Sequence, residues 1–354
     1  MNLRQQVGQL IIAGVEGAEL TALERTWLKL VQPGGIILFR RNIERAGQVT
    51  ALLRETTEIA GAPLFRCVDL EGGLVDRLRD LIAPMPSPAA VFATGRRTNF
   101  VKHGRLIGRE ARVLGFNTVF APVLDLGLPV SSAVMRTRVV SADPDEVAEY
   151  ALAFVEGLEV AGVLGCGKHF PGLGGGTLDS HEAMPLIERT WKQLWEEDLA
   201  VFRALALRLP MMMVAHAAYP LIKGKAPASI SPYWISTVLR KRMGFAGLVL
   251  SDDMEMGGIL TQVSIEEAAV KAVLAGTDVI EICRDPALVL RAYDALLAEA
   301  ERSAAFRRRV EAAARRVIEH KDRYLDAAMP RVASAAQIER LRTSVKNFAE
   351  DVAA

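Results

Sequence analysis

The sequence predicts an α/β protein that folds as a single-domain (β/α)8 barrel of the TIM type, with extra helices at its C-terminus. Eight short apolar runs alternate with amphipathic helical segments, as in a barrel whose parallel strands are buried on both faces. No change in composition and no linker interrupts this alternation, which indicates one unit rather than two. Alternation alone does not establish that the sheet closes, so a doubly wound open sheet is the alternative.

Each expected element follows from a local pattern. Apolar runs bounded by turn residues predict strands over 9–15, 35–39, 64–69, 118–125, 162–168, 211–216, 248–252 and 279–283. Apolar residues at helical spacing predict helices over 20–31, 46–60, 100–114, 146–160, 192–205, 232–243, 265–275 and 286–299. Before one of them, Asp143 suits the N-cap, Pro144 the first helical position and Glu146 a capping box.

The chain beyond the eighth β/α unit predicts further helix. Residues 1–302 are expected to form the catalytic barrel, and residues 303–354 a helical extension packed on it. In this extension Phe306, Val310, Ala313 and Val317 recur at helical spacing and form an apolar stripe. A last helix is expected over 335–352.

Composition excludes several classes of protein. The chain is 51% hydrophobic and its net charge is +1, so neither a nucleic-acid partner nor an anionic membrane surface is indicated. Cys67, Cys166 and Cys283 each lie in an apolar run without Cys-x-x-Cys spacing, as expected for reduced core thiols. No secretory signal and no membrane-spanning run is evident, and we expect a cytoplasmic protein.

Ionisable side chains gather where the expected strands end. In barrels of this class, catalytic groups come from the C-terminal ends of strands and the loops that follow. Charged groups leaving apolar strands are costly unless they are paired or functional, so many at one barrel mouth predict an active site. They are Asp69, Glu71, Asp125, Lys168, His169, His216, Asp252 and Asp253.

The loop after the fifth strand carries a second signal. From Lys168 to His181 it reads Lys-His-Phe-Pro-Gly-Leu-Gly-Gly-Gly-Thr-Leu-Asp-Ser-His, too rich in glycine for a helix or strand. Asp179 and His181 are two residues apart and would face the same side of an extended segment. The carboxylate would orient the imidazole and give an acid/base group that titrates near neutral pH. The alternative is a surface loop whose Asp and His only cap turns.

Other chemistries lack their motifs. Scattered cysteines and the absence of His-Glu-x-x-His give no metal site. The glycine stretch lacks the Lys-Ser/Thr of a phosphate-binding P-loop, opens no helix as a dinucleotide site would, and Ser180 has no Gly-x-Ser-x-Gly frame. We therefore expect no metal and no organic cofactor. Carboxylates with a histidine suit transfer of a glycosyl group to water.

The sequence resembles glycoside hydrolase family 3, in its bacterial β-N-acetylglucosaminidase branch. The resemblance rests on Lys-His-Phe-Pro-Gly followed by Asp179-Ser-His181, and it covers the chain from about residue 9 to the eighth strand. Further blocks agree in order: Val-Asp-Leu-Glu-Gly-Gly (68–73), Phe-Ala-Pro-Val-Leu-Asp (120–125), Met-Val-Ala-His-Ala-Ala-Tyr-Pro (213–220) and Gly-Phe-Ala-Gly-Leu-Val-Leu-Ser-Asp-Asp-Met-Glu-Met (244–256). It implies a single-domain barrel that removes terminal N-acetylglucosamine (GlcNAc), with cell-wall fragments in peptidoglycan recycling as substrates.

Roles follow from the resemblance residue by residue. Asp252 matches the nucleophile, His181 the acid/base and Asp179 its dyad partner. The residues at sugar-binding positions are Asp69, Arg77, Arg138, Lys168 and His169. Retention of configuration needs two such groups roughly 5 Å apart, and a histidine already has a suitable pKa.

Three departures from the family pattern leave alternatives open. Leu173 stands where histidine is common, Leu70 and Leu74 replace polar residues, and Val139-Val140 follow Arg138 where Ser-Phe is frequent. The surroundings of the site are therefore expected to be more apolar. The first hypothesis is a hydrolase acting on a small carbohydrate, GlcNAc-containing muropeptides, as a monomer. The second is a GlcNAc phosphorylase that uses the same residues, because a neutral imidazole repels phosphate less than a carboxylate does. The third is a sugar-binding relative with little or no catalysis.

Overall fold

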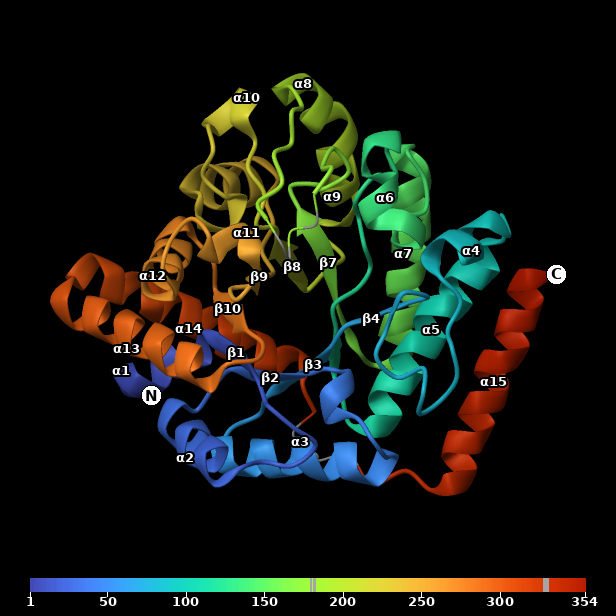
Figure 1. The fold of residues 1–354 in the computed structure, drawn as a ribbon, viewed down its shortest axis with the longest axis horizontal. Coiled ribbons are helices and arrows are strands. Elements are labelled where there is room, and N and C mark those ends of the chain that lie inside the picture. Colours follow the sequence, from blue (N-terminus) through green and yellow to red (C-terminus); the bar gives the residue numbers. More distant parts are fainter. Residues whose placement is uncertain (179, 181–182, 327–330) are drawn as a thin grey trace.

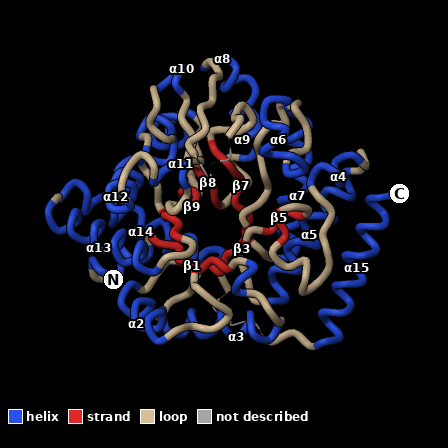
Figure 2. Tube along the Cα trace, in the orientation of Figure 1, coloured by secondary structure: helices blue, strands red, loops and turns tan. Residues whose placement is uncertain are grey.

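The computed structural model describes residues 1–178, 180, 183–326 and 331–354. Eight parallel strands close into a barrel in the order β1-β10-β9-β8-β7-β6-β3-β2, which confirms the (β/α)8 fold and excludes the open sheet. Figures 1 and 2 look into this barrel, with the strands at the centre and the helices around them. The strands are β1 (Ile11–Gly14), β2 (Gly35–Leu38), β3 (Phe65–Val68), β6 (Thr118–Val119), β7 (Leu164–Phe170), β8 (Met211–Val214), β9 (Leu248–Asp253) and β10 (Val279–Ile282).

One layer of helices covers the outside of the barrel. Its members are α2 (Ala22–Val31), α3 (Ala46–Ala60), α5 (Arg97–Leu114), α7 (Pro144–Ala161), α9 (Leu199–Leu205), the π-helix Tyr233–Arg242, α12 (Ile265–Ala275) and α13 (Pro286–Arg302). The N-cap expected for α7 is present, since Asp143 accepts hydrogen bonds from the backbone of Asp145 and Glu146. The capping box is absent, because the backbone N–H of Asp143 donates to Ser141 instead of Glu146.

Shorter helices and turns lie at the two ends of the barrel. They are α1 (Leu3–Gln9), α4 (Pro88–Ala93), α6 (Ser132–Met135), α8 (Trp191–Gln193), a π-helical turn (Leu194–Asp198), α10 (Pro220–Lys223), α11 (Gly257–Leu260) and single 3₁₀ turns. Between β3 and α4 the chain also forms an antiparallel hairpin, β4 (Leu70–Gly72) with β5 (Val75–Asp76). Neither α1 nor this hairpin was expected from the sequence.

The C-terminal residues form two helices with different positions. Helix α14 (Ala304–Tyr324) lies against α1 and α13, and its Val317 packs with the side chains inside the barrel. Nearby, Lys321 Nζ donates to Gln9 Oε1 at 2.6 Å, which ties α14 to α1. Helix α15 (Ala335–Ala353) runs along α5 (Figure 1). A domain boundary at residue 302 stays a prediction. No described helix is long and apolar enough to cross a bilayer.

Alternation along the strands determines which side chains face the barrel interior. Leu248 and Leu250 of β9 point inward, whereas Val249 packs outward against the helices. The interior is filled by apolar side chains, among them the three free cysteines. Because the period is two, the next inward position on β9 is Asp252, at the C-terminal end of the strand. On β3 the same alternation runs through Phe65 and Cys67, so the next inward position is Asp69.

A buried histidine packs against the β4–β5 hairpin. His103 of α5 is fully buried, and its Nδ1 lies 2.8 Å from the hydroxyl of Tyr150 in α7. Its ring sits so close to the hairpin that a Cβ on Gly72 would lie 2.9 Å from Nε2. Burial lowers the pKa of His103 to about 3. The imidazole is therefore neutral in the folded protein.

This neutral histidine predicts a loss of stability in acid. Below pH 6.5 the unfolded chain binds a proton at His103 that the folded chain refuses, so the free energy of unfolding falls as pH drops, by about 2 kcal/mol at pH 5. The variant His103→Leu/Tyr150→Phe replaces both partners with apolar groups. Between pH 7 and pH 5 its free energy of unfolding, measured with urea, should fall by about 2 kcal/mol less than that of the unmodified protein. An equal loss in both proteins would contradict the prediction.

Candidate active site

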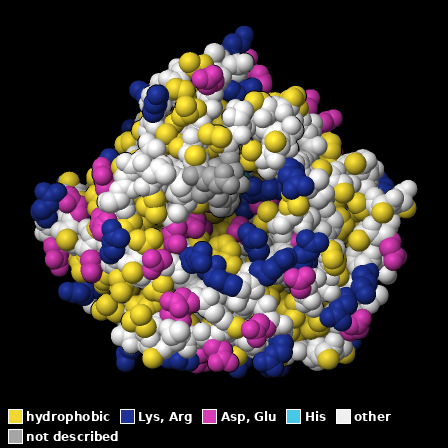
Figure 3. Space-filling model, viewed as in Figure 1, with side chains coloured by type: hydrophobic (Ala, Val, Ile, Leu, Met, Phe, Trp, Pro, Cys, Tyr) yellow, Lys and Arg dark blue, Asp and Glu magenta, His cyan; other side chains and the backbone are white. Residues whose placement is uncertain are grey.

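A cavity of about 320 Å³ opens at the C-terminal end of the barrel, within the range of small-molecule sites. Figure 3 shows it as a hollow in the centre of this face, with Lys and Arg side chains gathered at its edge. Six of the sequence-predicted site residues line it, together with others that the structure places beside them. The predicted ones are Asp69, Arg77, Arg138, Lys168, His169 and Asp252, and the additional ones include Glu71, Asp253, Glu281 and Cys283.

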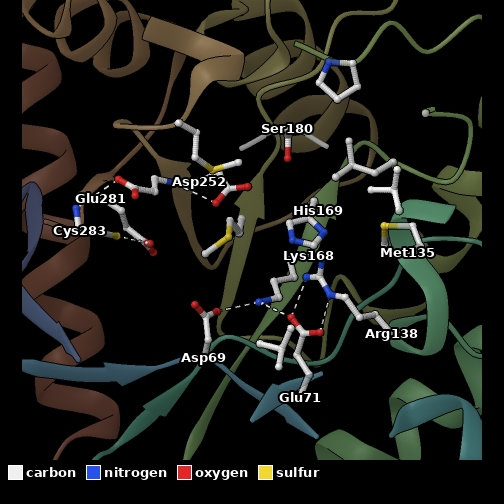
Figure 4. Close-up of a pocket in the computed structure, with 18 of the residues that line it drawn as sticks. Asp69, Glu71, Met135, Arg138, Lys168, His169, Ser180, Asp252, Glu281 and Cys283 are labelled. Carbon is white, nitrogen blue, oxygen red and sulfur yellow. Dashed lines mark hydrogen bonds and ion pairs between the residues drawn. The ribbon is translucent and has the colours of Figure 1, made fainter. Parts of the chain in front are cut away.

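Two carboxylates and two cations form a buried network on one wall (Figure 4). Lys168 Nζ, at the end of β7, lies 2.9 Å from Asp69 Oδ1 and 2.7 Å from Glu71 Oε1. Arg138 grips Glu71 with two parallel hydrogen bonds, from Nε and from a terminal nitrogen, each 2.8 Å long. Arg77 lies 3.7 Å from the other oxygen of Asp69. The network holds Lys168 and Arg138 in one orientation before any ligand arrives.

Ion pairing outweighs burial in this network. Burial disfavours the charged form of Glu71, but Arg138 and Lys168 hold the pKa of Glu71 well below its usual range. Burial likewise opposes the charge on Lys168, while Asp69 and Glu71 raise the pKa of Lys168 above its usual value. All these groups are therefore charged at neutral pH. A polar ligand such as a sugar would meet fixed donors and acceptors here.

His169 is oriented by a second buried carboxylate. Its Nδ1 donates to Asp125 Oδ2 at 2.6 Å, and the backbone N–H of Leu173 donates to Asp125 Oδ1 at 2.7 Å. The carboxylate thus fixes the ring and leaves Nε2 for a ligand. His216, at the end of β8, differs because both of its nitrogens are used inside the protein, by Ser229 Oγ and by the carbonyl of Asp253.

Two neighbouring aspartates end β9 and differ in their contacts. Asp252 points into the cavity, and its Oδ1 accepts one hydrogen bond, from the backbone of Asp253 at 2.9 Å (Figure 4). Asp253 Oδ1 instead accepts from the backbone of Glu255 and of Cys283, which holds the turn after the strand. Burial, then Glu255 and Asp252, raises the pKa of Asp253 to about 7. Of the two, Asp252 is the one whose carboxylate is not used to hold the turn.

The predicted dyad, Asp179 and His181, lies outside the described residues. Their described neighbours Leu178 and Ser180 both line the cavity, and the carbonyl of Ser180 accepts from the backbone of Gly258 at 3.0 Å. The first part of the loop is close against the barrel, since a Cβ on Gly174 would lie 2.5 Å from the carbonyl oxygen of Leu126. At its far end, Arg189 Nε lies 2.8 Å from the buried Asp198.

The three leucines that depart from the family pattern differ in whether they line the cavity. Leu173 lines the cavity, as expected, and makes that part of its wall apolar. Leu70 is instead fully buried in the core, and Leu74 is exposed on the hairpin turn. Only the first of these therefore changes the surroundings of the site in the expected way.

The roles of three residues that shape the site were not predicted from the sequence. Glu71 and Asp125 were noticed as polar strand ends, but their roles as partners of Arg138 and His169 depend on how distant segments meet. Glu281 was not noticed, although a single acidic residue within the apolar run Val279–Ile282 was a readable signal. Among the described residues, no three potential metal ligands converge.

Removing the charge of Glu71 should damage both stability and substrate binding. Glu71→Gln leaves Lys168 and Arg138 without their shared counter-ion, and breaking a buried pair costs about 3–5 kcal/mol. We expect a lower thermal midpoint and a higher KM. Asp80→Asn is a matched control, because Asp80 pairs with Arg40 at the surface at 3.5 Å and exposed pairs contribute about 1 kcal/mol or less. Equal effects of the two changes on calorimetric unfolding would contradict the prediction.

Comparison with known proteins agrees with this geometry. Residues 2–320 match the family described as glycosyl hydrolase family 3, N-terminal domain. A β-hexosaminidase of Idiomarina loihiensis is 36% identical over 305 residues, which cover 85% of this chain and 91% of the relative. A second β-hexosaminidase, from Thioalkalivibrio sulfidiphilus, is 37% identical over 293 residues, covering 81% and 84%.

Solved structures agree as well. A family 3 β-N-acetylglucosaminidase from Paenibacillus sp. strain FPU-7 superimposes with a TM-score of 0.89 at 31% identity, covering 98% of this chain and 69% of that one. A β-N-acetylhexosaminidase from Beutenbergia cavernae superimposes with a TM-score of 0.84 at 28% identity, covering 91% and 99%. These similarities favour catalysis over the third hypothesis, a sugar-binding relative.

Proposed function

The chain belongs to glycoside hydrolase family 3 and is a glycoside hydrolase, and from that premise we propose that it is a retaining exo-β-N-acetylglucosaminidase. The observation that carries the proposal is the position of Asp252, which points into a cavity of monosaccharide size opposite the network of Asp69, Lys168, Glu71 and Arg138. The named activities of the relatives support GlcNAc as the sugar.

Asp252 is proposed as the nucleophile. Its carboxylate attacks the anomeric carbon while the bond from that carbon to the leaving oxygen breaks, and a glycosyl-enzyme results. His181, oriented by Asp179, gives its proton to the leaving oxygen and then takes one from water, which displaces Asp252. The lining of the cavity by Leu178 and Ser180, on either side of Asp179, supports this part of the proposal.

The sugar hydroxyls are proposed to bind the pre-oriented polar groups. Lys168 has three N–H donors and spends two on Asp69 and Glu71, so one is left for a ligand. Asp69 offers acceptor oxygens, and His169 offers Nε2. Arg138 and Arg77 lie at the wall of the cavity. Together these groups would hold the ring so that its anomeric carbon faces Asp252.

A blind pocket explains why a terminal sugar would be removed. Below the polar groups the barrel is filled by side chains such as Met211 and Leu248, and Val317 of α14 packs into the same cluster. A chain of sugars therefore cannot pass through the barrel and must enter end first. This geometry supports exo action.

Cell-wall fragments are proposed as natural substrates. Anhydro-muropeptides carry carboxylate groups beyond the terminal GlcNAc, and the Lys and Arg side chains that gather at the edge of the cavity (Figure 3) suit an anionic leaving group. Hydrolysis of such a fragment should exceed that of an uncharged chitobiose at low ionic strength. A cytoplasmic location and a monomeric state stay predictions.

One assay tests the proposed activity. The purified protein is expected to release 4-nitrophenol from 4-nitrophenyl N-acetyl-β-D-glucosaminide at the same rate with and without phosphate, and NMR should show the β-anomer of GlcNAc forming first. GlcNAc-1-phosphate in the presence of phosphate would establish the phosphorylase instead. Formation of the α-anomer, or no release at all, would contradict the proposal.

A further inference from the structure

Strand β10 carries a carboxyl group inside the barrel. Val279 and Cys283 belong to the cluster of interior side chains, whereas Ile280 and Ile282 pack outward. Glu281 therefore points inward, and it lines the cavity while only 2% exposed. In Figure 4 its side chain lies on the same side of the cavity as Asp252, above Asp69.

The backbone of Glu281 is held in place by hydrogen bonds, but its carboxyl group has few partners. Its backbone N–H donates to Ser251 Oγ at 3.1 Å, and its carbonyl accepts from the backbone of Met254 at 2.8 Å. Oε2 is 3.9 Å from Cys283 Sγ, a weak contact. Oε1 has no hydrogen-bond partner among the residues that the structure describes. A buried polar oxygen left unpaired is costly, so a partner from outside the chain is indicated.

The charged groups around Glu281 favour its neutral form. The titratable groups that face it are Asp252 and Asp253 of β9, Cys67 of β3 and Asp69 just after it, Cys166 and Lys168 of β7, and Cys283 just after β10. Lys168 is already paired with two other carboxylates. Burial, and then repulsion from Asp252, raises the pKa of Glu281 well above its usual range. A protonated carboxyl has one O–H donor and one acceptor oxygen, as a ligand amide or hydroxyl requires.

We propose that Glu281 is a specificity-determining residue that hydrogen-bonds a hydroxyl or acetamido group of the bound sugar, beside the carbon that Asp252 attacks. The inference rests on the proposed function of the same pocket. It adds a polar contact from β10 to those from β3 and β7, so that the ring is held from two sides. The unsatisfied oxygen of the empty pocket becomes satisfied when the sugar binds, which favours ligands with a polar group at that place.

Substitutions at Glu281 separate recognition from structure. Glu281→Gln keeps the size, a donor and an acceptor, whereas Glu281→Leu is apolar like its neighbours. Ile282→Val is the matched control, since Ile282 is on the same strand and packs outward. We expect Glu281→Leu to raise KM and the inhibition constant of free GlcNAc about 5- to 150-fold, with an unchanged or higher thermal midpoint. Glu281→Gln and Ile282→Val should stay within about threefold of the unmodified protein.

The pH profile gives a second measure that a structural role would not move. As Glu281 ionises with rising pH it loses its donor, so KM of the unmodified protein should rise with that ionisation, whereas Glu281→Gln lacks the rise. Titration of Asp253 and Lys168 is common to both proteins and cancels in the comparison. If Glu281→Leu does not fold, the Gln variant alone decides the outcome.

Two results would overturn the inference while leaving the proposed function intact. They are an unchanged GlcNAc inhibition constant in Glu281→Leu, and the same rise of KM with pH in Glu281→Gln, both with normal hydrolysis in the unmodified protein. Failure of the unmodified protein to hydrolyse the substrate or bind GlcNAc would instead refute the proposed function itself.

Discussion

Asp252→Ala is expected to abolish turnover of every glycoside, by a factor on the order of 10⁵ or more, as for other enzymes that lose a nucleophile. Without the carboxylate no glycosyl-enzyme can form, whatever the leaving group. The measurement is kcat/KM for 4-nitrophenyl N-acetyl-β-D-glucosaminide. A fluorinated substrate analogue that slows both chemical steps should label the unmodified protein on the peptide carrying Asp252, as mass spectrometry would show.

Asp253→Asn is the matched control for this prediction. Asp253 accepts two backbone hydrogen bonds at Oδ1, which an amide oxygen can also accept, and its raised pKa means that much of it is already uncharged near pH 7. Its loss of activity should therefore stay within about tenfold. If Asp253→Asn lost more activity than Asp252→Ala, Asp253 rather than Asp252 would be the nucleophile.

The fold was predictable because burial of parallel strands leaves a strong mark on the sequence. Helices α3 and α12 begin and end where their apolar periodicity does. The strand expected over 118–125 is shorter, since Pro122 cannot donate to the sheet and the regular ladder ends at Val119. Helix α1 was readable after all, from the capping box of Asn2 and Gln5. The π-helical segments were not, because no residue type or motif in the sequence marks hydrogen bonds from i to i+5.

The site residues that could be predicted are those whose inward direction follows from the alternation of side chains along a strand. Asp252 follows Leu248 and Leu250 at a spacing of two, so its inward direction is a local property of β9. The pairing of Glu71 with Arg138 joins residues 67 apart and requires the β4–β5 hairpin to fold back over the barrel mouth. Local sequence patterns do not encode that distance. Most inward-facing residues, Glu281 excepted, could therefore be predicted from the sequence, but the pairings that orient them could not.

His181→Ala should separate proton donation from the rest of catalysis. A natural sugar alkoxide leaves poorly without a proton, so its hydrolysis should fall by about two to four decades. 4-Nitrophenolate leaves without help, so formation of the glycosyl-enzyme from that substrate should fall much less. Deglycosylation also loses its base, and the glycosyl-enzyme should accumulate after a burst of 4-nitrophenol equal to the enzyme concentration.

Asp179→Asn distinguishes the dyad from a lone histidine. The amide cannot stabilise the imidazolium as a carboxylate does, so we expect a smaller loss than in His181→Ala, with the same dependence on the leaving group. Ser180→Ala lies between the two and is a control for the loop, because Ser180 binds Gly258 through its carbonyl rather than its side chain. Two results would mean that the loop acts by shaping the pocket and that the proton comes from another group. One is an equal loss in the rate of glycosyl-enzyme formation from alkyl and nitrophenyl glycosides in His181→Ala. The other is a loss of activity in Ser180→Ala as large as in the dyad variants.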